Sequence, residues 1–203
     1  MLDVQQGDRV LDLCAAPGNK RAQLAQRAGP TGQVIAGDLH WHRLREMTSL
    51  PPDTRVWKVA LDGCLPLPFR VTFDRILVDA PCSGTGTLRR HPEIKWRLRS
   101  SDLGELSQKQ LHLLDSAATA LRPGGRLVYS TCSLEPEENQ DVIERFLKAH
   151  QEFRLRPLRE DAPTLAPFLL ASAAGLLEQD FLETFPDRDG TDGFFAAILV
   201  KEP

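Results

Sequence analysis

Short apolar runs alternate along the chain with stretches in which apolar residues recur every three or four positions. The runs predict buried strands and the periodic stretches predict helices. The predicted strands are residues 10–14, 33–38, 55–60, 73–79, 126–130 and 194–201. The predicted helices are residues 20–28, 40–50, 103–121 and 136–150. This alternation favours a parallel α/β sheet with helices on both faces.

Residues 151–190 break this alternation, because they contain several prolines and show little periodicity. We expect a loop-rich insertion there, placed before the last strand. The length of 203 residues suits one domain, and a hydrophobic fraction of 41% is enough for a core. The chain shows no secretion signal and no apolar stretch of membrane-spanning length. We therefore expect a cytoplasmic protein.

The net charge of −3 excludes a generally basic nucleic-acid binder but leaves room for a local basic patch. Four cysteines occur, at positions 14, 64, 82 and 132, and no two of them form a CxxC pair. A zinc ribbon or a thioredoxin-type site is therefore not expected, and no metal is predicted. Free thiols are the default in such a chain, and a small buried hydrophobe is the simplest interpretation of each.

Ligands of open α/β sheets bind at the carboxyl ends of the strands, so the residues after each strand are informative. The first predicted strand is followed by small residues and one glycine, Gly18, which let the backbone approach a ligand closely. The second strand ends in Asp38, which is able to accept hydrogen bonds from ribose hydroxyls. Asp62 follows the third strand and is able to accept from an adenine amino group. An ordinary turn and two surface carboxylates are the alternative, but the joint placement favours a nucleoside ligand.

Two cysteines follow neighbouring predicted strands. Cys82 comes three residues after Asp79, and Cys132 ends the sequence Ser-Thr-Cys after the fifth strand. A thiolate is a strong nucleophile, and a helix N-terminus or a nearby cation lowers its pKa. The pattern predicts a functional thiol pair, with a redox pair or two buried side chains as alternatives.

The segment between these cysteines, residues 88–99, carries five Lys or Arg against one Glu. Basic residues bind phosphates, and the Trp96 ring among them is suited to stack on a base. A solvated charged loop is the simpler alternative. The position between the two cysteines favours a polynucleotide substrate.

Four segments, residues 12–20, 79–86, 130–133 and 192–196, resemble the motifs of the RNA cytosine-5 methyltransferases, the Nol1/Nop2/Sun family. Residues 89–96 and 136–139 are most similar to its bacterial Sun/Fmu (RsmB) branch, which modifies small-subunit ribosomal RNA. The resemblance implies a Rossmann-like fold with a mostly parallel seven-stranded sheet. It also implies that S-adenosylmethionine (SAM) is the methyl donor. The expected partner is RNA, with 16S ribosomal RNA as the preferred candidate, and the enzyme is expected to be a monomer.

The resemblance also assigns roles. Cys132 attacks carbon 6 of the cytosine, Cys82 assists product release, and Asp79 holds the base and borders the cofactor. The other expected cofactor residues are Cys14, Ala15, Ala16, Pro17, Gly18, Lys20, Asp38 and Asp62. The expected RNA-binding residues are Arg89, Arg90, Lys95 and Trp96.

The chain departs from the family pattern at two loop positions, with Asn19 where a second glycine is usual and Arg21 where a threonine is usual. Asn tolerates unusual backbone angles, so we expect the loop to keep its form. Residues 1–203 are expected to be a catalytic domain without the family's N-terminal RNA-binding segments. A cytosine-5 methyltransferase of tRNA or another RNA stays an alternative. A weakly active scaffold that binds RNA or SAM is a second, although the paired cysteines and Asp79 argue against it.

Overall fold

The computed structural model describes residues 1–48 and 55–203. The chain divides into two compact units. The first unit contains residues 2–79, 112–127 and 201–203, and the second contains residues 1, 80–111 and 128–200. Strand β5 (Leu121–Thr131) and the long helix α4 (Ser100–Ala120) each pass from one unit to the other.

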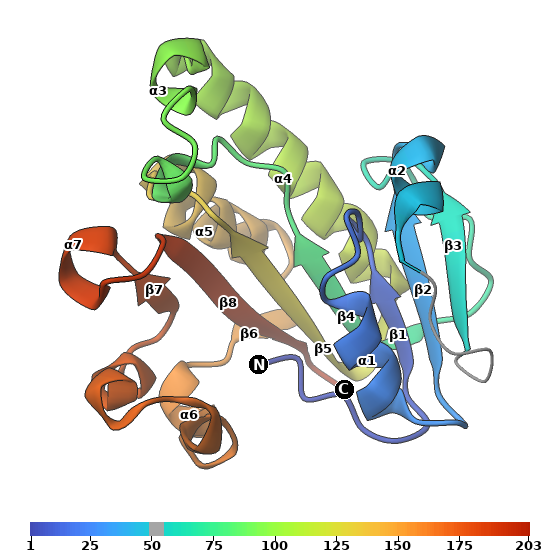
Figure 1. Cartoon of the computed structure of the whole chain (residues 1–203). Coiled ribbons are helices and arrows are strands. Elements are labelled where there is room, and N and C mark those ends of the chain that lie inside the picture. The colour runs from blue at the N-terminus through green and yellow to red at the C-terminus, as the bar shows by residue number, and fades with distance from the viewer. Residues whose placement is uncertain (49–54) are drawn as a thin grey trace. The chain divides into compact units, whose positions relative to one another are not determined.

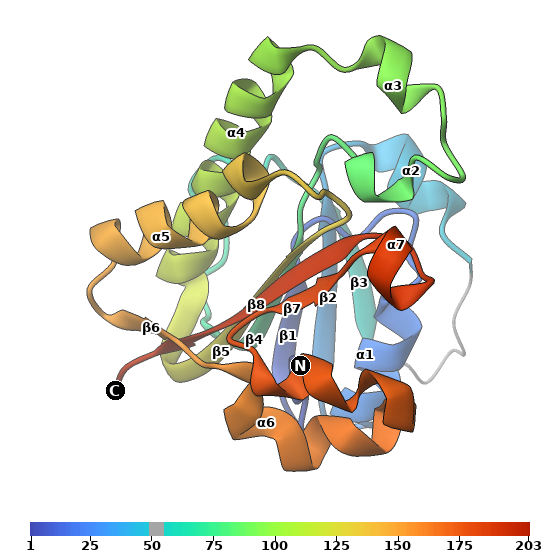
Figure 2. The same cartoon turned by 90° about the vertical axis from the view of Figure 1, so that its left-hand side faces the viewer.

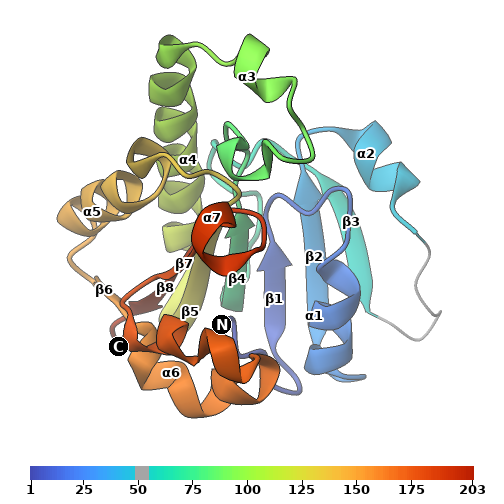
Figure 3. The same ribbon diagram turned by 60° about the vertical axis from the view of Figure 1, so that its left-hand side comes forward.

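The first unit is built on parallel strands. Strands β1 (Arg9–Asp12), β2 (Gln33–Asp38), β3 (Val56–Ala60) and β4 (Phe73–Asp79) lie in the order β3-β2-β1-β4, and β5 follows β4. The pairs β1–β2, β1–β4 and β2–β3 are all parallel, and the arrows of β1, β2 and β3 point the same way in Figure 3. Their carboxyl ends therefore meet at one edge, as the sequence pattern predicted.

Helices cover both faces of the strands in the first unit. Helix α1 (Arg21–Ala28) packs against β1 and β2, and α2 (Trp41–Glu46) packs against β2 and β3. The end of α4 lies on the opposite face from α1 (Figures 1 and 2). The core between these layers consists of fully buried aliphatic side chains, among them Val10, Leu11, Ala36, Ile76 and Leu114.

The second unit contains the short and irregular elements. Strand β8 (Phe194–Lys201) lies between β5 and β6 (Phe153–Leu155), and β7 (Leu182–Thr184) pairs with β8 in antiparallel direction (Figure 2). Its helices are α3 (Ile94–Arg97), the start of α4, α5 (Gln140–Ala149), α6 (Leu158–Leu165) and α7 (Pro186–Asp189). Four 3₁₀ segments complete it, η1 (Thr85–Thr87), η2 (Pro136–Glu138), η3 (Ala166–Phe168) and η4 (Ala171–Glu178).

The α/β class with a mostly parallel sheet is confirmed, but the described residues form a sheet of eight strands instead of seven. Two of them, β6 and β7, lie in the region predicted to be loop-rich. Each has only three residues, which is too short for an alternating pattern to stand out. Both strands are neighbours of β8, which follows later in the chain. Short strands of this kind depend on tertiary pairing more than on local sequence.

Most other predicted boundaries hold within a few residues, but β5 begins at Leu121, five residues before the predicted strand 126–130, because it runs on through Pro123 and the two glycines that follow. Helix α4 begins three residues earlier than predicted and ends at Ala120, because Leu121 already belongs to β5. The predicted helix 40–50 ends at Glu46, since Met47 is extended; residues 49 and 50 lie outside the described residues. Even α4, with 21 residues, is not apolar enough to cross a bilayer, and neither is any other helix of the described residues.

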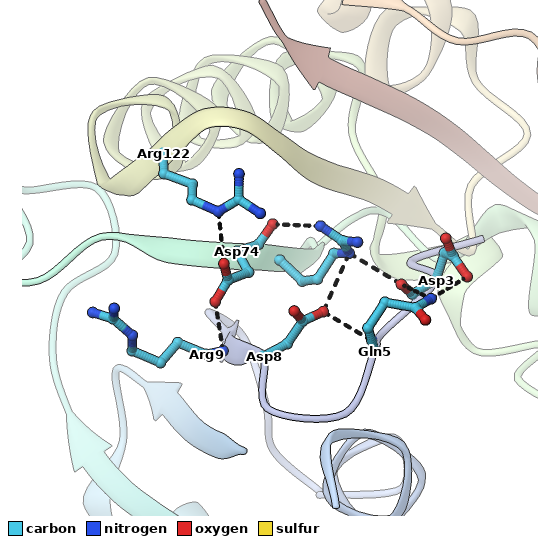
Figure 4. Close-up of polar contacts among 7 residues, drawn as sticks. Asp3, Gln5, Asp8, Arg9, Asp74 and Arg122 are labelled. Atoms are coloured by element: carbon cyan, nitrogen blue, oxygen red, sulfur yellow. Dashed lines mark hydrogen bonds and ion pairs between the residues drawn. The ribbon is translucent and has the colours of Figure 1, made fainter. Parts of the chain in front are cut away.

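A polar network joins the N-terminal segment to the starts of the strands in the first unit (Figure 4). The Asp74 carboxylate accepts hydrogen bonds from the Arg9 backbone N–H (2.7 Å) and from Nε of Arg122 (2.6 Å). Arg75 donates to the carbonyl of Asp3 at 3.1 Å. This network fixes the edge of the sheet opposite the carboxyl ends of the strands.

Candidate functional site

The two cysteines predicted to act together are neighbours in the second unit. Cys132 directly follows β5, and Cys82 follows β4 by three residues. Their sulfur atoms are 3.4 Å apart, and both side chains are partly buried free thiols. The backbones before them are also joined, because the Ala80 N–H donates to the carbonyl of Ser130 at 2.8 Å.

Two glycines bring a third chain segment against this pair. The Gly86 N–H donates to the carbonyl of Cys132 (2.9 Å), and the Gly193 N–H donates to the carbonyl of Gly86 (2.8 Å). A Cβ atom on Gly86 would lie 2.3 Å from the Gly193 oxygen and 2.8 Å from the Cys132 oxygen. Only glycine allows this approach of backbones, so the spacing of the cysteine-bearing segments depends on it.

The carboxylate of Glu138 lies beneath the turn that carries Cys82. Its side chain is 0% exposed, and its two oxygens accept the Ser83 N–H at 2.9 and 3.2 Å. It also accepts from the Ser83 hydroxyl and, at 2.9 Å, from the Gln110 amide, which donates to the carbonyl of Pro81 as well. The predicted helix 136–150 would place Glu138 in its first turn, where the helix dipole favours an acid.

The structure corrects this interpretation of Glu138. The predicted helix 136–150 begins as the 3₁₀ turn η2, and Asn139 leaves the helical region before α5 starts at Gln140. The break turns Glu138 into the interior. The nearby Ser133 hydroxyl lies 3.1 Å from that of Ser83, so the residues that follow the two cysteines are also in contact.

The two thiols differ in their electrostatic surroundings. A hydrogen bond to Cys132 raises the pKa of Cys82, and burial and the negative charges of Cys132 and Glu138 add to this effect. Cys82 therefore holds its proton more tightly than an ordinary thiol, while the distance between the sulfurs allows either of them to donate. When Cys82 is the donor, the Cys132 sulfur that accepts the hydrogen bond is stabilised in its thiolate form.

The loop after β1 forms a small pocket in the first unit. The pocket has a volume of about 60 Å³ and is lined by Asp12, Cys14, Ala15, Ala16, Pro17, Gly18, Asn19, Lys20 and Asp79. Gly18 has φ +103°, a value that side chains rarely adopt, so glycine is required there. Asn19, in contrast, has no positive φ, so the loop keeps its form without unusual angles at this position. Lys20 forms an ion pair with Asp79 across the pocket.

Asp12, at the end of β1, was missed by the sequence reasoning. It is buried, and its Oδ1 atom has no hydrogen-bond partner. Burial, with a further contribution from the Asp79 charge, raises the pKa of Asp12 to about 7. A buried, unpaired oxygen beside a pocket is a natural acceptor for a ligand. The signal available in the sequence was an acid in the middle of the apolar run of residues 10–14.

Cys14 differs from the pair of Cys82 and Cys132, because its thiol has no reason to ionise. Burial raises the pKa of Cys14, and the charges of Asp12, Asp38 and Asp79 raise it further. Its thiol therefore stays neutral, and only its place in the loop pocket fits a role in ligand binding.

The two acids predicted to bind a nucleoside are placed differently. Asp38 is only 5% exposed and accepts the backbone N–H groups of Ala16 (3.2 Å) and His40 (3.0 Å). It therefore ties the end of β2 to the loop pocket. Asp62 is exposed and accepts the Cys64 N–H at 2.9 Å, and it is not among the residues that line the pocket.

The predicted RNA-binding residues lie on the surface of the second unit. Arg89 and Arg90 both form ion pairs with Asp192, the former at 3.7 Å. Trp96, on α3, is 83% exposed, and Nζ of Lys95 lies 5.5 Å from the centre of its ring. An exposed aromatic ring among cations is suited to contact a base and phosphates.

Comparison with known proteins supports the resemblance. A family model described as "16S rRNA methyltransferase RsmB/F" matches residues 1–200. "Ribosomal RNA small subunit methyltransferase B" of Erwinia tasmaniensis is 40% identical over all of this chain, and that of Yersinia pseudotuberculosis is 39% identical. The chain spans 44% of the length of each of these two relatives.

Solved structures share the fold. The crystal structure of PH0851 matches with a TM-score of 0.84 and 36% identity, over 98% of this chain and 44% of its own. NSun6 from Pyrococcus horikoshii, solved with SFG, matches with a TM-score of 0.79 and 28% identity, over 100% of this chain and 50% of its own.

Proposed function

Because the chain belongs to the family of 16S rRNA methyltransferases RsmB/F, we propose that it transfers a methyl group from SAM to carbon 5 of a cytosine in RNA. The observation that carries this proposal is the pair of thiols 3.4 Å apart after β4 and β5. A methyltransferase that acts on a nitrogen or an oxygen has no need of two such thiols. The names of the relatives make 16S ribosomal RNA the expected substrate.

SAM is the methyl donor of this family, and NSun6 was solved with SFG, a SAM analogue. When bound, SAM supplies a methyl group that is electrophilic because it sits on a sulfonium. The loop pocket suits the amino-acid end of this ligand, since the buried and unpartnered Oδ1 of Asp12 is suited to accept from an ammonium group. The backbone from Cys14 to Gly18 would hold the methionine end of the ligand. Asp38 would hold its ribose, and Asp62 its adenine.

Cys132 provides the nucleophile in this proposal. Carbon 5 of cytosine is too weak a nucleophile to take a methyl group directly. The Cys132 thiol loses its proton to solvent, and its sulfur forms a bond to carbon 6, which shifts the electrons of the C5–C6 double bond so that carbon 5 becomes nucleophilic. After carbon 5 has gained the methyl group, its proton leaves to a base and the S–C6 bond breaks, which restores the double bond.

Cys82 assists this sequence as a hydrogen-bond donor. Its protonated thiol lies against the Cys132 sulfur, where it stabilises negative charge on that atom. This charge exists before the attack and again when the Cys132 thiolate departs from carbon 6. Loss of Cys82 is therefore expected to slow the release of the product more than the formation of the adduct.

The substrate base and its RNA need further contacts. Asp79 would accept from the cytosine edge, while its ion pair with Lys20 orients the carboxylate. Arg89, Arg90 and Lys95 would contact phosphates, and Trp96 would stack on a base. The target cytosine must be unpaired or flipped out of its helix to reach the thiols.

The test is a methylation assay with this chain, SAM carrying a labelled methyl group, and 16S ribosomal RNA. Nucleoside mass spectrometry is expected to find the label in 5-methylcytidine, and sequencing after bisulfite treatment would map its position. Label in another nucleoside contradicts the assignment to carbon 5. SAM binding by calorimetry without any transfer to RNA supports the scaffold alternative instead.

A further inference from the structure

The buried carboxylate of Glu138 has no role in the mechanism above, although it is the most completely buried acid of the second unit. An ionised group in such a position is costly unless it is fully hydrogen-bonded. Glu138 meets this condition, because it accepts from the Ser83 N–H, the Ser83 hydroxyl and the Gln110 amide. The two Ser83 donors belong to the turn that carries Cys82, and Gln110 is hydrogen-bonded to that turn at the Pro81 carbonyl.

Glu138 and Gln110 together hold both sides of Cys82. On one side the Gln110 amide donates to the carbonyl of Pro81 at 3.0 Å, and on the other side the Ser83 N–H donates to Glu138 at 2.9 Å. The two partners are joined to each other at 2.9 Å. The backbone before and after the thiol is therefore fixed by one buried pair of side chains.

We propose that Glu138 is a positioning residue, which with Gln110 fixes the 81–83 turn so that the Cys82 S–H points at the Cys132 sulfur. The proposal rests on the function proposed above, in which Cys82 acts as a donor to Cys132. Glu138 is proposed to act through Cys82, since its side chain is fully buried and its hydrogen bonds go to Ser83 and Gln110.

The charge of Glu138, like its hydrogen bonds, favours the protonated form of Cys82 in this proposal. The hydrogen bond to the Cys132 side chain, burial, and the charges of Cys132 and Glu138 raise the pKa of the Cys82 thiol, while a backbone hydrogen bond at Cys132 lowers it. A negative charge beneath the turn opposes ionisation of Cys82, so the proton stays on this sulfur. A neutral residue of the same shape would keep much of the packing and lose this effect.

The test compares Glu138→Gln with Glu137→Gln, which removes an exposed carboxylate one residue away. Thermal unfolding first establishes that both variants are folded. Alkylation of Cys82 by iodoacetamide, resolved by peptide mass spectrometry between pH 6 and pH 10, then reports on its thiol without any RNA. We expect Cys82 to be alkylated faster at each pH in Glu138→Gln than in the wild-type chain, and at the wild-type rate in Glu137→Gln.

Methylation kinetics provide the second readout. We expect kcat of Glu138→Gln to fall roughly tenfold or more, which corresponds to the loss of a hydrogen bond to a charged group, while KM for RNA is unchanged. A Cys82 profile equal to that of Glu137→Gln, or a wild-type kcat, overturns the proposal. If the wild-type chain makes no 5-methylcytidine, the proposed function fails, and the alkylation profile still decides the role of Glu138.

A second variant covers the case in which Glu138→Gln does not fold. Gln110→Met has nearly the same shape, and the Oε1 atom that it removes is buried without a partner, so the exchange is expected to be tolerated. It releases the carbonyl of Pro81 and keeps the carboxylate. We expect a lower kcat with unchanged KM for RNA; a wild-type kcat in a folded Gln110→Met overturns the proposal.

Discussion

Replacing Gly86 by alanine tests whether the backbone contact beside the cysteine pair sets the geometry of the site. The added Cβ atom would lie 2.3 Å from the Gly193 oxygen and 2.8 Å from the Cys132 oxygen. Both are backbone atoms, so no side chain is able to rotate away, and the segments must separate by roughly 1 Å to reach ordinary contact distance. Overpacking of this kind costs about 1–3 kcal/mol of stability.

The matched control is Gly104→Ala, in the exposed part of α4. A Cβ atom on Gly104 meets nothing within 4 Å, and alanine is favoured over glycine in a helix by about 1 kcal/mol. In a chain of this size 1 kcal/mol shifts Tm by about 2–4 °C. We therefore expect Tm to fall in Gly86→Ala and to rise in Gly104→Ala, as measured by calorimetry.

The separation should also reach the thiols, because the Cys132 carbonyl is one of the atoms displaced. Loss of the hydrogen bond between the sulfurs should let iodoacetamide alkylate Cys82 at lower pH in Gly86→Ala than in the wild-type chain. An equal or higher Tm for Gly86→Ala, together with an unchanged Cys82 profile, would refute the argument that the glycine contact holds the pair at its spacing.

Three further predictions concern the two binding surfaces and the sheet edge. Asp38→Ala should weaken SAM binding by roughly 1–3 kcal/mol, about 5- to 150-fold, and calorimetry that finds wild-type affinity contradicts its role. Replacing Arg89, Arg90 and Lys95 by alanine should lower RNA affinity and flatten its salt dependence, and an unchanged salt slope reduces the segment to a solvated loop. Burial alone would raise the pKa of Asp74, but hydrogen bonds from Arg9 and Arg122 lower it below its ordinary value of 3.8. Its contribution to stability is therefore full above pH 3.8 and lost as the pH falls through the lowered pKa, so Asp74→Asn should flatten the fall of Tm between pH 4 and pH 2.

The regular part of the fold was predictable because its signals are local. The strands of the first unit each contain a short apolar run, and the rule that ligands bind at their carboxyl ends led to the Gly18 loop and Asp38 without any structure. The same rule led to Cys82 and Cys132, which the structure places in contact. Strands β6 and β7 were not predicted, because a strand of three residues is too short to show an alternating pattern.

The role of Glu138 was not predictable for a different reason. An acid near a helix start is explained equally well by the helix dipole and by burial. What decides between them is contact with Ser83 and Gln110, which are 55 and 28 residues away in the chain. Asp12 is a similar case, because only the packed structure shows that its Oδ1 atom lacks a partner.

The central claim is that Cys132 attacks the cytosine and Cys82 releases it, and one gel tests it directly. Labelled RNA is incubated with SAM and with Cys82→Ala or Cys132→Ala, in a form of the protein that binds RNA, and separated under denaturing conditions. Cys82→Ala is expected to accumulate a covalent RNA–protein adduct, because attack and methyl transfer remain possible while elimination stalls. Cys132→Ala is expected to form no adduct and to lose methylation. The reverse pattern would exchange the two roles, and methylation by both variants without any adduct would contradict thiol catalysis altogether.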